Sequence, residues 1–263
     1  MSMLHKPKIL FYDIETKPLQ AWLWAPGKQY VGHKQLVKEY SQYGIICVTY
    51  CWNDGKPAQA IDWGYEAQDT KEVVKQFDEI IKQADLTIGK NSDRFDTKMI
   101  NACRMFAGLP GMPAWTKYTD DLERQMRRYF RMPSQSLDYI SNQLGLGGKI
   151  KMEFQDWVDI CEKNKDGVKS LAKMIKYGKK DVEDTRTLWF KLAEHFDSKW
   201  NQSTYEDNGI RCKHMDCGSL LLRKDGTRQA GNVTYQQYFC TSCGRYAGRR
   251  SLSQVLKMEG KVK

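Results

Sequence analysis

The order of apolar and polar residues along the chain predicts an alternation of strands and helices. Short apolar runs predict buried strands at 8–12, 44–52, 58–63 and 85–89, with a turn sequence, Asn53-Asp54-Gly55-Lys56, between the second and the third. A fifth strand is expected to end at Tyr118-Thr119. Apolar residues at helical spacing predict helices at 73–84, 97–107 and 171–196, and helices are expected through most of 121–198. This order predicts an α/β fold in which helices flank a mixed five-stranded sheet.

The composition changes near the C-terminal quarter of the chain. Residues 195–210 are polar and typical of a linker. We therefore expect a first domain at 1–198, a linker at 199–210 and a small domain at 211–263. The 263 residues suit one α/β domain of about 200 residues together with one small module.

Acidic residues lie at the ends of expected strands and on the longest expected helix. Asp13 and Glu15 follow the first strand, and in an extended chain they project from the same face. Asp96 follows the fourth strand, and Tyr177 and Asp181 are four residues apart on one face of the long helix. Four such carboxylates suit a phosphodiesterase site that holds two divalent cations.

Each of these motifs alone has an ordinary structural explanation. The first acidic pair suits a solvated strand end, and Asp96 suits a cap of the helix that follows it. Tyr177 and Asp181 suit a surface pair, with Asp184 as a rival acid on that side of the helix.

Together, the three motifs resemble the DEDD superfamily of 3′–5′ exonucleases, in the branch with a tyrosine in the third motif (DEDDy). This superfamily includes the proofreading domains of family A and family B DNA polymerases. Its patterns are Asp-x-Glu, Asn-x-x-x-(Phe/Tyr)-Asp and Tyr-x-x-x-Asp, and the chain has Asp13-x-Glu15, Asn91-x-x-x-Phe95-Asp96 and Tyr177-x-x-x-Asp181. Residues 131–140 and 144–148 are also similar to stand-alone bacteriophage exonucleases. The resemblance covers roughly residues 8–198 and implies a ribonuclease H-like fold.

The resemblance implies a role for each matched residue. The four acids Asp13, Glu15, Asp96 and Asp181 would hold two Mg²⁺ or Mn²⁺ ions, which prefer carboxylate oxygen. Tyr177 would orient the attacking water. The implied reaction releases nucleoside 5′-monophosphates from the 3′ end of DNA. Two further nucleic-acid-binding candidates are weaker, Asn91 for substrate contact and Phe95 for packing.

Two cysteine pairs near the C-terminus have the spacing of metal ligands. Cys212-x4-Cys217 and Cys240-x2-Cys243 are separated by 22 residues, and four thiolates complete a tetrahedral site for one structural Zn²⁺. A glycine follows the second cysteine of each pair, at 218 and 244, where a tight turn needs a permissive backbone.

The residues between the cysteine pairs predict two strands, at 220–223 and 233–239, joined through Asp225-Gly226. This arrangement resembles a zinc ribbon. His214 is an alternative ligand inside the longer pair. A disulfide framework is the other alternative, and it is disfavoured because the remaining four cysteines show no pairing and the chain starts without a secretory signal.

The net charge of +10 is concentrated in the C-terminal domain. Residues 199–263 hold 12 Lys and Arg against 5 Asp and Glu, a net charge of +7. Such a basic module beside a nuclease site favours contact with a phosphate backbone. The expected contacts are Arg211, Lys213, Arg223, Lys224, Arg228, Arg245, Arg249 and Arg250.

Aromatic residues of the same domain are candidates for base stacking, namely Tyr235, Tyr238, Phe239 and Tyr246. For Tyr235 and Phe239, burial in the domain core is the preferred interpretation. In the first domain, the basic stretch Arg124–Arg131 suits a second backbone contact or, slightly better, a solvated helix face. Trp22, Trp24 and Tyr30 suit either a groove for terminal bases or packing of their loop against the sheet.

The preferred function is thus a metal-dependent exonuclease that acts on a free 3′ end of DNA, and single-stranded DNA is the expected form. The ribbon is expected to bind nucleic acid or a partner such as a separate DNA polymerase. The alternatives are an RNA exonuclease or an endonuclease with the same site, and an inert nucleic-acid-binding adaptor. A run of 18 apolar residues is absent, so we expect no membrane span. Free paired cysteines favour a cytoplasmic location, in a host if the chain is phage-encoded.

Overall fold

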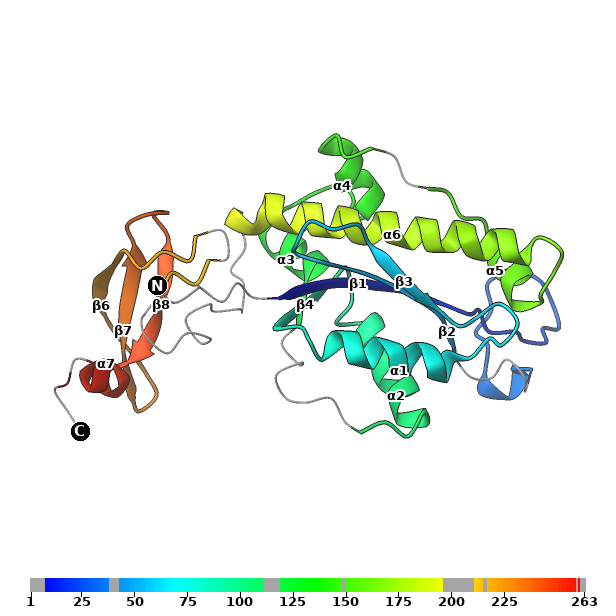
Figure 1. Cartoon of the computed structure of the whole chain (residues 1–263), viewed down its shortest axis with the longest axis horizontal. Helices are drawn as coiled ribbons and strands as arrows, with labels where there is room; N and C mark the ends of the chain where they lie inside the picture. Colours follow the sequence, from blue (N-terminus) through cyan, green and yellow to red (C-terminus); the bar gives the residue numbers. More distant parts are fainter. Residues whose placement is uncertain are drawn as a thin grey trace. The chain divides into compact units, whose positions relative to one another are not determined.

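The structure is a computed structural model that describes residues 8–37, 43–110, 119–147, 150–195, 211–214, 217–258 and 260. It contains two compact units, one formed by Lys8–Trp189 and the other by the remaining residues (Figure 1). The linker expected at 199–210 lies outside the described residues. No helix of the described part of the chain is long and apolar enough to span a membrane.

The first unit is built on a mixed five-stranded sheet in the order β3-β2-β1-β4-β5. Strands β1, β2 and β3 are antiparallel, whereas β4 lies parallel to β1 and β5 parallel to β4. The sheet and the hairpin expected from the apolar runs are therefore confirmed. The strand bounds are β1 (Ile9–Thr16), β2 (Ile45–Trp52), β3 (Gln59–Asp62), β4 (Leu86–Gly89) and β5 (Thr119–Asp121).

Helices cover both faces of this sheet. Figure 1 shows α1 and α2 on one side and the long α6 on the other. The helices are α1 (Thr70–Ile81), α2 (Asp96–Phe106), α3 (Leu122–Tyr129), α4 (Leu137–Gln143), α5 (Phe154–Cys161) and α6 (Gly167–Leu192), with short 3-10 turns η1 (His33–Gln35) and η4 (Ala193–His195). Both helix-covered faces exclude water from the central strands, which explains why β1 and β2 read as nearly continuous apolar runs.

The two faces of β1 are chemically different. Tyr12 lies on the α1 and α2 side, where its ring is 5.5 Å from that of Phe77 and its hydroxyl is 2.9 Å from Thr97 Oγ1. Because side chains alternate along a strand, Asp13 and Glu15 lie on the opposite side, which α6 covers. The core packing of the even-numbered residues thus fixes the direction in which the two acids point.

The second unit is a three-stranded antiparallel sheet in the order β6-β7-β8, followed by a short helix. Its elements are β6 (Leu222–Ala230), β7 (Val233–Cys240), β8 (Tyr246–Ser251) and α7 (Leu252–Met258). The sequence predicted neither β8 nor α7.

The turn predicted at Asp225-Gly226 is wrong. Strand β6 continues through these residues, and the pairing of Ala230 with Val233 makes Gly231-Asn232 the hairpin turn. The register instead shifts between Lys224 and Thr227, where Gly226 has a φ of 72°. The Asp-Gly pair therefore serves a bulge inside the strand, because a positive φ suits a bulge as well as a turn.

Candidate functional site

Strand β1 carries the first two candidate carboxylates, on the side that α6 covers, and β2 lies beside it. Asp13 pairs in register with Thr49, and Glu15 pairs with Cys47. Burial raises the pKa of the Cys47 thiol well above its usual value, and the neighbouring Glu15 and Asp13 carboxylates raise it further. This thiol therefore stays protonated beside the two acids.

Asp96 lies directly against the backbone that joins the first two acids. Its Oδ1 accepts a hydrogen bond of 3.1 Å from the Ile14 N–H, beyond the end of β4. Asp96 is the first residue of α2 and its cap position is Phe95, so the alternative that Asp96 caps this helix is wrong. Burial raises the pKa of Asp96 to about 6, although the N–H donors of Asp96 and Ile14 oppose the rise, and the Asp121 carboxylate adds to it. The first two motifs thus meet in space.

Helix α6 brings the third motif to the same region. Gly178 packs on β2 so closely that a Cβ there would lie 2.8 Å from Thr49 Cγ2, and Thr49 is the register partner of Asp13. Burial raises the pKa of Tyr177 well above its usual value, and the Asp181, Glu15 and Asp13 carboxylates raise it further. Tyr177 is therefore a protonated hydroxyl, close enough to three of the four candidate acids for their charge to raise its pKa.

The rival acid on α6 has a different environment. Asp184 is ion-paired with Lys180 of the same helix. Lys180 also approaches the Leu146 carbonyl at 3.4 Å. The charge of Asp184 is thus balanced by Lys180 of the same helix, and Asp184 is not among the carboxylates that raise the pKa of Tyr177.

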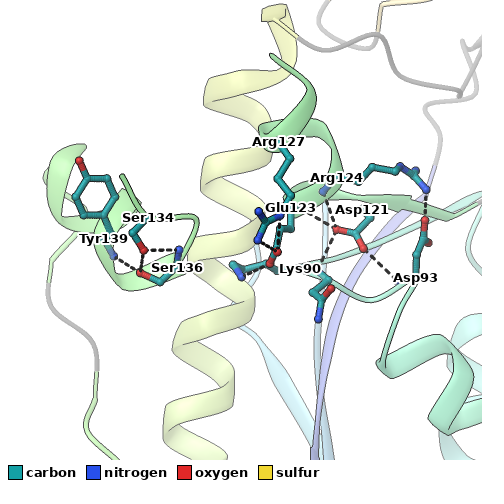
Figure 2. A network of polar contacts seen from close by, with 10 residues as sticks. Lys90, Asp93, Asp121, Glu123, Arg124, Arg127, Ser134, Ser136 and Tyr139 are labelled. Atoms are coloured by element: carbon teal, nitrogen blue, oxygen red, sulfur yellow. Dashed lines mark hydrogen bonds and ion pairs between the residues drawn. The ribbon is translucent and has the colours of Figure 1, made fainter. Parts of the chain in front are cut away.

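Asp121 holds the loop that leads to Asp96, a role that the sequence did not predict. Its Oδ1 accepts from the N–H groups of Asn91, Glu123 and Arg124 at 3.0, 2.9 and 3.2 Å, and its Oδ2 accepts from Asp93 N–H at 3.1 Å (Figure 2). Asp121 is the N-cap of α3, a position that aspartate favours because its side chain accepts from the first N–H groups of a helix. The same carboxylate additionally ties α3 to the 91–96 loop.

Ion pairs also hold α3 against the 91–96 loop, and they involve arginines of the basic stretch 124–131. Arg124 is paired with Asp93, and Lys90 Nζ lies 2.7 Å from Glu123 Oε2 (Figure 2). Arg124 Nη2 also lies 2.9 Å from Asp120 Oδ1. Arg127 Nη2 also lies 2.7 Å from Glu123. These contacts give Arg124 and Arg127 structural roles at the junction.

Several aromatic residues of the first unit are exposed. Phe95, expected to have a packing role, is 45% exposed, so its side chain is only partly packed within the unit. Trp22, Trp24 and Tyr30 are 78%, 100% and 94% exposed, which excludes the alternative that they pack their loop against the sheet. Asn91 adopts a φ of 61°, and its carbonyl accepts from Phe95 N–H at 3.2 Å, which shapes the loop before Asp96.

The donor set of the first unit fits hard divalent cations. Asp13, Glu15, Asp96 and Asp181 supply carboxylate oxygens, the ligands that Mg²⁺ and Mn²⁺ prefer. Burial raises the pKa of Tyr177, and the Asp181, Glu15 and Asp13 carboxylates raise it further; a bound cation would offset the charge of these acids. Within the described residues, the only group of three or more potential ligands whose atoms all lie within 4.8 Å of one another is in the second unit, so the four acids are spread more widely than the ligands of a single ion.

That compact group consists of the four predicted cysteines. Cys212 Sγ lies 3.7 Å from Cys243 Sγ, and Cys217 Sγ lies 3.6 Å from Cys240 Sγ. Four sulfurs at about 2.3 Å from one Zn²⁺ in a tetrahedron lie roughly 3.8 Å apart, whereas disulfide sulfurs are about 2.05 Å apart. The cysteine cluster therefore fits a zinc site, and these sulfur distances exclude a disulfide within it.

The backbone around Cys240 favours a thiolate, whereas burial raises the pKa of Cys212 and Cys217. Burial opposes ionisation of Cys240, but N–H groups of Cys243 and Ser242 and the neighbouring thiols lower its pKa to about 7. Gly218 and Gly244 have φ values of 53° and 69°, as expected for the turns after each pair. The alternative ligand His214 is buried and its Nε2 lies 3.0 Å from the Tyr246 carbonyl, outside the four-sulfur group.

The aromatic residues of β7 that are buried are not the ones that the sequence analysis favoured for the core. Tyr238, a stacking candidate, is buried in the core of the second unit. Tyr235 and Phe239 are only partly buried, and guanidinium groups of Arg249 and Arg223 lie 4.3 and 5.2 Å from their ring centres. The sequence contained the information that Tyr238 is buried, because residues two and four positions before Cys240 on a strand share its face.

Neither a protein-family model nor a curated protein sequence matches this chain. Among solved structures, the family B DNA polymerase from the hyperthermophilic archaeon Pyrobaculum calidifontis matches with a TM-score of 0.52 and 14% sequence identity. The two folds are similar. The match covers 87% of this chain and 32% of that chain, so this chain spans about a third of the polymerase's length. At this identity the likeness shows the fold alone.

Proposed function

We propose that the first unit is a metal-dependent 3′–5′ exonuclease of the DEDDy type with a ribonuclease H-like fold. The observation that carries this proposal is the convergence of all three motifs. The Asp96 carboxylate contacts the Ile14 N–H between Asp13 and Glu15, and the carboxylates of Asp181, Glu15 and Asp13 lie close enough to Tyr177 to raise its pKa. The structural neighbour is a family B DNA polymerase, from a group whose proofreading domains the motifs resemble.

Each residue of the proposed site has a defined task. The four carboxylates hold two Mg²⁺ or Mn²⁺ ions, which neutralise charge at the scissile phosphate and acidify water when bound. Tyr177 keeps its proton, so it orients the attacking water as a hydrogen-bond donor and does not act as a general base. Asn91 and Phe95, beside Asp96 and partly or largely exposed, contact the terminal nucleotides.

The substrate that we propose is DNA with a free 3′ end, and the products are nucleoside 5′-monophosphates. The second unit, with a structural Zn²⁺ on Cys212, Cys217, Cys240 and Cys243, assists by binding nucleic acid or a partner such as a separate DNA polymerase. Its proposed nucleic-acid contacts include Arg223, Lys224, Arg245, Arg249 and Arg250.

A time course on 5′-labelled single-stranded DNA and on RNA of the same sequence tests the proposal. With Mg²⁺ or Mn²⁺ the DNA should shorten in single-nucleotide steps from its 3′ end, and with neither ion it should stay intact. Cleavage at internal positions would replace the exonuclease with an endonuclease, and faster loss of RNA would change the substrate. Intact DNA and RNA in the presence of either ion would favour an inert adaptor.

A further inference from the structure

The sheet of the second unit has two faces of different character. Along β7, Gln236, Tyr238 and Cys240 are buried on the face that carries the cysteine cluster. Tyr235 and Phe239 alternate with them and are partly exposed on the other face. The outer face therefore presents aromatic rings that the core of this unit does not use.

Arginines from both neighbouring strands flank these rings. In register, Phe239 faces Arg223 and Tyr235 faces Arg228, both on β6. The guanidinium carbon of Arg223 lies 5.2 Å from the Phe239 ring centre, and that of Arg249 on β8 lies 4.3 Å from the Tyr235 ring centre. We call these five residues the aromatic–arginine face. The rings hold the guanidinium groups of Arg223 and Arg249 in place, which reduces the entropy that these side chains lose when they bind a ligand.

The charge of the three strands suits a polyanion. Strands β6, β7 and β8 hold five Lys and Arg and one acid, Asp225, a net charge of +4. An apolar partner surface would leave these cations without compensation, whereas phosphates pair with them directly.

We propose that the aromatic–arginine face binds single-stranded nucleic acid by stacking bases on Tyr235 and Phe239, with Arg223, Arg228 and Arg249 contacting the intervening phosphates. This inference rests on the proposed function only in taking nucleic acid as the partner. Tyr235 and Phe239 are four residues apart on one strand, which places them about 13 Å apart. Bases stacked in a duplex follow one another every 3.4 Å or so and have no free faces, so the two rings suit separate bases of an unstacked strand.

Fluorescence anisotropy with the full-length protein tests this face. The probe is a labelled single-stranded DNA of mixed sequence, with Zn²⁺ present and with Mg²⁺ and Mn²⁺ left out so that binding is measured without cleavage. Tyr235→Ala and Phe239→Ala should each weaken binding about tenfold, because stacking of one base is worth roughly 1–3 kcal/mol. Arg249→Lys, which keeps the charge but loses the planar stack, should bind more weakly than wild type and better than Arg249→Ala.

Thr234→Ala is the matched control, since Thr234 is an exposed residue of the same strand whose side chain points to the opposite face from Tyr235 and Phe239. It should bind DNA as wild type does, and all variants should retain stoichiometric zinc. Wild-type affinity in both aromatic variants, or equal affinity for single-stranded and duplex DNA, would overturn the proposal. So would binding of an acidic protein in place of DNA. Binding that depends on Tyr235 in a protein without nuclease activity would uphold this inference and refute only the exonuclease.

Discussion

Asp121 offers the sharpest test of how the loop before Asp96 is held. Its Oδ1 accepts hydrogen bonds from three backbone N–H groups, and its Oδ2 accepts a fourth from Asp93 N–H. Asp121→Ala removes all four acceptors. Asp121→Asn keeps an oxygen for the first three and turns an NH₂ group toward Asp93 N–H, so the two substitutions separate the cap of α3 from the tie to the loop.

The expected magnitudes follow from these contacts. Loss of an N-cap costs about 1 kcal/mol, and each of the two loop N–H groups left without a partner costs roughly another 1 kcal/mol. Asp121→Ala should therefore lower the free energy of unfolding by about 3 kcal/mol and Asp121→Asn by about 1 kcal/mol. For a unit of this size, these losses correspond to falls in Tm of roughly 6–12 °C and 2–4 °C.

Thermal unfolding and exonuclease assays of the same preparations compare the stability and the activity of these variants with those of the wild type. Asp69→Ala is the matched control, because Asp69 caps α1 by accepting from Lys71 and Glu72 N–H but does not reach another loop. It should lose about 1 kcal/mol of stability and no activity, whereas Asp121→Ala should lose activity even at temperatures where it is folded. The reasoning would be refuted if Asp121→Ala were as stable as wild type, or if both Asp121 variants lost the same stability.

The other predictions concern the two metal sites. Asp13→Ala or Asp181→Ala should abolish cleavage and leave the circular dichroism spectrum unchanged; near-normal activity in either would contradict the assignment. With Mg²⁺ and Mn²⁺ withheld, the raised pKa of Asp96, about 6, means that its folded form binds a proton more tightly than the unfolded chain. Protonated Asp96 therefore stabilises the fold below about pH 4, and this contribution, on the order of 3 kcal/mol, is lost as the pH rises through 6. Urea unfolding at several pH values should show that Asp96→Asn removes this pH dependence. Cys240→Ser should lose zinc, measured by metal analysis, and lower the stability of the second unit; full zinc retention would count against the four-cysteine site.

The sequence predicted those features that depend on local periodicity. The apolar runs predicted the sheet, and the period of two correctly placed Asp13 and Glu15 on one face. The cysteine spacing predicted the sulfur cluster, because ligand pairs in tight turns carry their geometry locally.

Features that depend on contacts between distant residues were not predictable in this way. Asp121 contacts a loop about 30 residues away, and nothing in its local sequence distinguishes that role from an ordinary helix cap. Both Asp225-Gly226 and Gly231-Asn232 suit a hairpin turn, and only the pairing of β6 with β7 selects the second. The position of Cys240 indicated which residues of β7 are buried. Burial was nevertheless predicted for Tyr235 and Phe239, because aromatic residues are often buried.

The most direct test of the central claim is anomalous diffraction from crystals grown with Mn²⁺. The account predicts two peaks roughly 3.5–4 Å apart, bounded by the carboxylates of Asp13, Glu15, Asp96 and Asp181. Mn²⁺ bound only elsewhere in the protein, or a single ion that leaves Asp181 or Asp96 without a metal, would contradict it.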